Sequence, residues 1–173
     1  MKEIIVYTVG GIALIFWILS IQNTKKIKIL RLQNIANLFY AIQYAVLSAF
    51  SAMGMNVLSL VRGIIFINYE KRKKQNSNVI IIIFSVITIL IGIITYDSWY
   101  SLIPIINTLA YSYSTWQKNT KIIRIIFFVA AILWIIYNFI VKAYIPMIGN
   151  VLEVISAIVA IIKFDILKKK KIE

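Results

Sequence analysis

Hydrophobic residues occur along this chain in long runs that short polar stretches separate. The first run extends from Ile4 to Ile21 and contains no charged residue. A run of this length predicts a membrane-spanning helix, because about 20 apolar residues are needed for an α-helix to cross a bilayer. The runs are far longer than a typical strand of about five or six residues. The pattern predicts seven spanning helices, at residues 4–21, 32–50, 53–69, 79–96, 99–117, 125–141 and 144–162.

Two of the predicted helix boundaries depend on turn signals. Residues 32–61 contain no charge and are too many for one span. The small residues Ser48, Ser51 and Gly54 predict a turn within this stretch, between the second and third helices. Residues 97–98, an aspartate and a serine, predict another short turn between the fourth and fifth helices.

The distribution of basic residues predicts the orientation of the helices. The chain has 19 Lys and Arg but only 6 Asp and Glu. Sixteen of the basic residues follow the first, third, fifth and seventh helices, whereas only Lys2 and Lys142 lie at the opposite ends. Cytoplasmic loops of membrane proteins are enriched in Lys and Arg. We therefore expect a multi-pass protein of the cell (inner or plasma) membrane with its N-terminus outside and its C-terminus in the cytoplasm.

The composition excludes several classes of function. Between apolar runs, the basic residues would meet anionic lipid headgroups and would not form a nucleic-acid-binding surface. The chain has no Cys and no His, which excludes disulfides, thiol chemistry and imidazole catalysis. No acidic cluster or phosphate-binding glycine loop is present. The sequence therefore predicts no enzyme, no cofactor, no metal and no nucleic-acid partner.

An internal repeat relates the first three predicted helices to the last three. A shift of 94 residues places Met53-x-x-Asn56-Val57-Leu58 on Met147-x-x-Asn150-Val151-Leu152. Two three-helix units of the same orientation require one helix between them, which predicts an all-α membrane protein with a 3+1+3 parallel-repeat arrangement. In such proteins the solute site lies near the bilayer midplane, where the halves meet. The predicted units are residues 1–74, the linker helix 75–97, and 98–173 with a basic cytoplasmic tail.

Three short stretches resemble a known family: Tyr40-Ala-Ile-Gln43-Tyr44, Ser59-Leu-Val-Arg62 and Trp134-Ile-Ile-Tyr137-Asn138-Phe139. On these residues the chain resembles the YgjV family of bacterial inner-membrane proteins, which is distantly similar to the SWEET and PQ-loop transporters. The resemblance implies a SWEET-like fold, in which paired asparagines on the third helix of each half are similar to Asn56 and Asn150. The Pro-Gln dipeptide of the PQ-loop group is absent, since Pro104 stands without a glutamine.

Two ionisable residues lie deep in predicted spans, Arg62 in the third and Glu153 in the seventh. A charge at the centre of a spanning helix costs about 2.5–3.5 kcal/mol on insertion scales, so such residues face the protein interior. The repeat places the two residues one helical turn apart on equivalent faces, where they could approach each other across a central cavity. The functional interpretation is a substrate-binding or gating ion pair. The alternatives are a structural pair that locks the halves together, or an Arg62 side chain that extends to the interface.

Polar and aromatic residues at equivalent positions supply further candidates. Asparagines could clamp a polar solute or simply join helices, and aromatic rings could stack on a flat solute or simply pack. Tryptophans near helix ends, Trp17, Trp99 and Trp116, are interpreted as interfacial anchors. The predicted substrate-binding residues are Arg62, Glu153, Asn56, Asn150, Tyr40, Trp134, Asn138 and Asn107.

These observations predict a facilitator or secondary transporter of a small polar solute. The alternative is a non-transporting scaffold or accessory subunit in which the polar pairs are structural. A cavity that reaches Arg62 and Glu153 would favour transport, whereas a tightly packed centre would favour the scaffold. The sequence does not identify the solute or a coupling ion, and it leaves open whether the chain forms homo-oligomers.

Overall fold

The computed structural model describes residues 2–21, 26–72, 78–116, 120–162 and 166. This part of the chain contains seven α-helices, one 3₁₀ turn and no strand, which confirms the predicted all-helical fold. The elements are α1 (Lys2–Ile21), α2 (Lys26–Val46), α3 (Phe50–Lys71), α4 (Asn78–Ile94), η1 (Trp99–Ser101), α5 (Leu102–Trp116), α6 (Thr120–Ile140) and α7 (Tyr144–Ile161).

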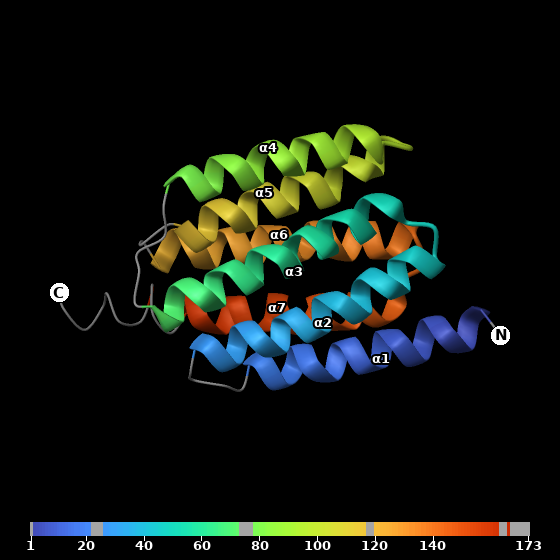
Figure 1. Cartoon of the computed structure of the whole chain (residues 1–173). Helices are drawn as coiled ribbons and strands as arrows, with labels where there is room; N and C mark the ends of the chain where they lie inside the picture. The colour runs from blue at the N-terminus through green and yellow to red at the C-terminus, as the bar shows by residue number, and fades with distance from the viewer. Residues whose placement is uncertain (1, 22–25, 73–77, 117–119, 163–165, 167–173) are drawn as a thin grey trace.

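The helices lie side by side as a bundle (Figure 1). Helix α2 packs between α1 and α3, and α6 packs between α5 and α7. Further contacts join α1 to α7 and α3 to α5, so these six helices form a closed ring. Helix α4 lies outside the ring, against α5 and α3. We call the end where α1, α3, α5 and α7 begin the amino end of the bundle, and the opposite end the carboxyl end.

The bundle has an apolar exterior and an unusually polar interior. Helix α4 illustrates the exterior, because Phe84, Thr88 and Gly92 at every fourth position face the protein while Ile82 and Ile93 are exposed. Such large exposed apolar surfaces are rare on soluble monomers. Buried positions of the other helices, in contrast, include serine, asparagine and glutamine side chains. Large apolar side chains on the outside, with polar side chains among the buried residues, suit a protein that is surrounded by lipid.

Length and hydropathy single out two described helices that could each cross a membrane, at Glu3–Ser20 and Phe50–Tyr69. Three shorter apolar helical stretches occur at Asn78–Ile94, Arg124–Ile140 and Tyr144–Val159. The seven predicted spans correspond to the seven observed helices, but their insertion in a bilayer stays a prediction.

The basic residues that were expected in two loops lie instead on helices. Helix α2 includes Lys28 and Arg31, and helix α6 includes Lys121 and Arg124. Lys and Arg are good helix formers, so the backbone can remain helical beyond the apolar run. Their long side chains can still reach water from such a position.

The α2–α3 and α6–α7 corners have the same backbone structure. Ser48 and Lys142 adopt left-handed conformations with φ of 59° and 60°. After each of them, a backbone N–H bonds back across the helix end, from Ala49 to the Tyr44 carbonyl at 2.9 Å and from Ala143 to the Asn138 carbonyl at 2.8 Å. This is a Schellman-type helix end. The predicted turn at Ser48 is thereby confirmed, and its counterpart lies 94 positions later. Ser51 and Gly54, which were expected in the same turn, lie within α3.

Glycine at either corner is expected to stabilise the protein. A left-handed conformation costs a residue with a Cβ about 1–2 kcal/mol, and glycine avoids this cost. Ser48→Gly and Lys142→Gly should each raise the free energy of unfolding by about 1 kcal/mol, as measured by thermal unfolding in detergent. Ser48→Ala is the matched control and should give no gain. Glycine variants no more stable than this control would contradict the expectation.

Candidate functional site

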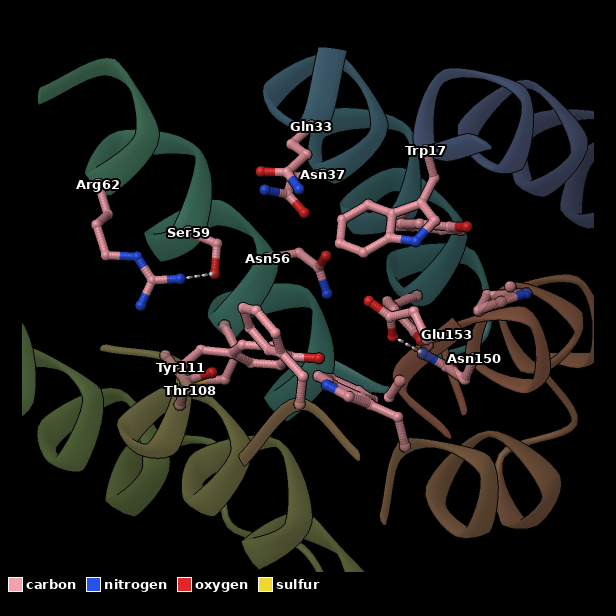
Figure 2. Close-up of a pocket in the computed structure, with 18 of the residues that line it drawn as sticks. Trp17, Gln33, Asn37, Asn56, Ser59, Arg62, Thr108, Tyr111, Asn150 and Glu153 are labelled. Carbon is pink, nitrogen blue, oxygen red and sulfur yellow. Dashed lines mark hydrogen bonds between the residues drawn. The ribbon is translucent and has the colours of Figure 1, made fainter. Parts of the chain in front are cut away.

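A pocket of about 380 Å³ lies inside the ring of six helices (Figure 2). All six ring helices contribute to its wall and α4 does not. The pocket extends along the bundle from Tyr44 and Pro146, near the amino end, to Gln33 and Arg124, nearer the carboxyl end. Its lining residues are Trp17, Gln33, Asn37, Tyr40, Tyr44, Met55, Asn56, Ser59, Arg62, Thr108, Tyr111, Arg124, Phe127, Trp134, Pro146, Gly149, Asn150, Glu153, Ser156 and Ala157.

Six of the eight predicted site residues line this pocket. They are Arg62, Glu153, Asn56, Asn150, Tyr40 and Trp134. Asn138 is fully buried and lies behind the wall, where it contacts residues that do line the pocket. Asn107 is also fully buried, but neither polar atom of its side chain has a hydrogen-bond partner among the described residues, and it does not line the pocket.

The Arg62 guanidinium is held by hydroxyl groups. Its Nη1 donates a hydrogen bond to Ser112 Oγ of α5 at 2.6 Å, and its Nη2 donates to Ser59 Oγ at 3.5 Å. The Ser112 hydroxyl in turn donates to the Thr108 carbonyl oxygen at 2.8 Å. This bond directs a lone pair of Ser112 towards Arg62. The arginine therefore links α3 to α5 through a neutral partner.

Glu153 is the last acceptor in a chain of four side chains. The Tyr44 hydroxyl donates to Asn138 Oδ1 at 2.6 Å, and Asn138 Nδ2 donates to Asn150 Oδ1 at 2.9 Å. Asn150 Nδ2 then donates to Glu153 Oε2 at 3.2 Å (Figure 2). Every donor in this chain points towards the carboxyl group. The chain joins α2, α6 and α7, and it holds Glu153 Oε2 in a fixed position.

In the part of the chain that the structure describes, no ion pair joins Arg62 to Glu153. Figure 2 shows the two side chains on opposite sides of the pocket. The two side chains, which could have met across the cavity, are therefore not paired in this conformation. The physical reason is that each has a nearer neutral partner, Ser112 for the guanidinium and Asn150 for the carboxyl group.

Asn56 and Asn150 occupy equivalent positions but have different partners. Asn56 Nδ2 donates to the Ala52 carbonyl oxygen one turn back on its own helix, at 2.8 Å. Asn150 bonds to Asn138 and Glu153 instead. The two asparagines therefore do not pair with each other, and both remain on the pocket wall.

Aromatic rings form much of the remaining wall. Trp134 is stacked at 6.2 Å from Tyr44 and packs edge-on against Tyr137 at 5.6 Å. Tyr111 lies 5.2 Å from Phe127. These separations are within the usual range for ring pairs. The pocket wall therefore combines aromatic rings with polar and charged side chains.

The sequence analysis missed several lining residues. Trp17 was interpreted as an interfacial anchor, but it lines the pocket. The internal repeat is the signal that could have identified Trp17 as a lining residue. Fourteen of the twenty lining residues form seven pairs of equivalent positions, 94 residues apart. The Tyr44–Asn138 hydrogen bond joins residues with the same spacing. The pairs are Trp17 with Tyr111, Gln33 with Phe127, Tyr40 with Trp134, Met55 with Gly149, Asn56 with Asn150, Ser59 with Glu153, and Arg62 with Ser156.

Comparison with known proteins gives one match. The model of a protein family described as bacterial inner membrane protein, Imp-YgjV, matches residues 4–168. No curated protein and no solved structure matches the chain. The match confirms the resemblance to the YgjV family, whereas the similarity to SWEET transporters stays a prediction.

Proposed function

Because the chain belongs to the Imp-YgjV family of bacterial inner membrane proteins, we propose that it carries a small polar solute across the inner membrane through the pocket in its helix ring. It would act as a facilitator or secondary transporter, by binding and movement without a chemical step. The observation that carries the proposal is a cavity of about 380 Å³ lined by Arg62, Glu153 and the two asparagines at equivalent positions, Asn56 and Asn150. A cavity of this size lies in the range of small-molecule sites, about 300–1,000 Å³.

The proposal includes seven membrane spans with the amino end outside and the carboxyl end in the cytoplasm. The apolar exterior of the helices supports the spans. The described basic residues Arg31, Lys71, Lys121 and Arg124 lie on helix turns at the carboxyl end, which favours a cytoplasmic location for that end. Lys2, the first residue of α1, and Lys142 are the exceptions at the amino end.

The 3+1+3 arrangement, with units 1–74, 75–97 and 98–173, is also part of the proposal. Three observations support it. The pairs of ring helices that pack together stay the same when α1, α2 and α3 are exchanged with α5, α6 and α7, whereas α4, which packs on α5 and α3, lies outside this symmetry. The two corners have the same hydrogen bonds. The hydrogen bond from Tyr44 to Asn138 joins two positions that are themselves 94 residues apart, as expected for residues that face each other on a twofold axis.

The hydrogen bond between Tyr44 and Asn138 is the contact that would close the pocket towards the outside in this proposal. Tyr44 and Asn138 lie near the amino end of the bundle, closer to that end than most of the lining residues. Their bond at 2.6 Å ties the halves together there. Rocking of one half against the other would break this contact and open the pocket outwards, as alternating access requires.

A non-transporting scaffold remains the alternative, because the bonds between α2, α6 and α7 would serve it equally well. Thiol labelling can separate the two functions, because the chain has no native cysteine to remove. Ser59→Cys and Ser156→Cys place thiols in the pocket, and Val61→Cys places one on the exposed apolar face of α3 as a matched control.

We expect a membrane-impermeant thiosulfonate to modify both pocket thiols in right-side-out and in inside-out vesicles. Access from both sides follows if the pocket opens alternately to each. The Val61→Cys thiol should stay unmodified from either side, because thiolates do not form in lipid. Pocket thiols that react from one side only, or from neither, would exclude a transport path. Mass spectrometry of the purified protein measures the modified fraction.

A further inference from the structure

Resting on this proposed function, we propose that the solute is a zwitterion. It would be a compact molecule with an anionic group bound at Arg62, a cationic group bound at Glu153 and an apolar or aromatic side group that packs against the rings of the pocket. The juxtaposition that carries the proposal is two opposite charges in one pocket that do not neutralise each other.

Arg62 provides the anion-binding end. A guanidinium has five N–H donors, and the structure gives Arg62 two hydrogen bonds, both to hydroxyl oxygens. Hydroxyl groups accept these bonds without cancelling the positive charge. A carboxylate can take two parallel bonds from a guanidinium and neutralise it at once. A group of that kind is therefore the complement of this end of the pocket.

Glu153 provides the cation-binding end. Its Oε2 accepts one bond from Asn150, and Oε1 has no bond among the described residues. Trp134 and Tyr40 add aromatic rings to the same pocket. An ammonium group bonded to Glu153 would also gain from neighbouring rings, which attract cations through their faces.

A solute of one charge alone fits less well. A cation would leave the Arg62 charge without a counter-ion, and an anion would do the same to Glu153. A neutral sugar would leave both charges without a counter-ion. Arg124, the other lining cation, already takes part in a further interaction. Both unpaired charges lie at a depth where an uncompensated charge is costly, so a solute that cancels both should bind best.

Four matched probes test this inference on the purified protein in detergent. They are L-phenylalanine, its amide (cation only), N-acetyl-L-phenylalanine (anion only) and N-acetyl-L-phenylalanine amide (neutral). We expect phenylalanine to bind at least tenfold more tightly than each derivative, as measured by isothermal calorimetry and thermal shift. L-Leucine and L-serine carry the same two charges and test other side chains. The inference is overturned if no zwitterion binds at millimolar concentration, or if a derivative binds as tightly as its parent.

Variants assign each charge to its residue. Arg62→Gln should remove the preference for phenylalanine over its amide, and Glu153→Gln should remove the preference over the N-acetyl derivative. Arg62→Lys should restore part of the first preference, which a merely misfolded variant would not do. Preferences that persist in both glutamine variants would overturn the assignment.

Uptake into proteoliposomes separates this inference from the proposed function. Zwitterion binding without uptake would refute transport and leave the site in place. Uptake of a neutral sugar without zwitterion binding would refute the zwitterion site and leave transport in place. Binding together with uptake of the same zwitterion supports both.

Discussion

Arg62→Met is expected to lower solute uptake at least tenfold and to make the protein more stable. The uptake falls because the guanidinium supplies charged donors for an anion at the pocket wall beside Ser59 and Ser112. A hydrogen bond to a charged group contributes about 1.5–3 kcal/mol, and 1.4 kcal/mol corresponds to a factor of ten. The stability rises because a charge without a counter-ion leaves the protein interior. We expect a gain of about 2 kcal/mol.

The opposite directions of these two effects make the experiment informative. Uptake is measured in proteoliposomes with L-phenylalanine, or with whichever tested zwitterion the wild type takes up fastest, and stability by thermal unfolding. Val61→Met is the control, because Val61 is the preceding residue and its side chain is exposed on the outside of the bundle. It should change neither quantity. If Arg62→Met destabilised the protein and uptake fell in proportion, the residue would be structural.

Asn138→Leu and Asn107→Leu are expected to change stability in opposite directions. Both asparagines are fully buried on ring helices. Asn138 accepts from Tyr44 and donates to Asn150, so its replacement leaves the buried Tyr44 hydroxyl and the partly buried Asn150 amide oxygen without this bond. Each unsatisfied group costs about 1–3 kcal/mol, which gives a loss of about 3 kcal/mol. Asn107 has no partner among the described residues, and leucine of similar size should gain about 1 kcal/mol by removing an unsatisfied amide.

Each variant serves as the control for the other, because the substitution and the degree of burial are the same. Thermal or denaturant unfolding in detergent measures both. A second readout is uptake, which should survive in Asn107→Leu because this residue does not line the pocket. Equal losses of stability in the two variants would show that the hydrogen bonds of Asn138 have no particular role.

The sequence was sufficient to predict the helices because their signal is local. Apolar runs of membrane length, bounded by basic residues or by small residues near Ser48, identify each helix without knowledge of its neighbours. The helix starts were predicted less well, since Lys28 and Lys121 extend α2 and α6 beyond the apolar runs. Hydropathy alone does not distinguish a charged helical turn from a loop.

Part of the site was predicted from the sequence, and the internal repeat helped to identify that part. Equivalent positions such as Asn56 and Asn150 were found because both halves contribute them. The partner of Arg62 was not predicted, because Ser112 has no charge and its proximity depends on how α5 packs on α3. Asn107 was placed in the site from its type and depth, although only packing decides whether a polar side chain faces the pocket or the helix contacts.

The hydrogen bond between Tyr44 and Asn138 has a consequence for how such a chain could have arisen. In a symmetric dimer of one three-helix half, the same residue type would face its own copy at this point, either phenol against phenol or amide against amide. If the proposed repeat arose by duplication, joining the halves in one polypeptide frees the two positions to diverge, and in this chain Tyr44 is the donor and Asn138 the acceptor. Neither half alone, paired with itself, could rebuild this bond, so the fused chain is committed to its asymmetry.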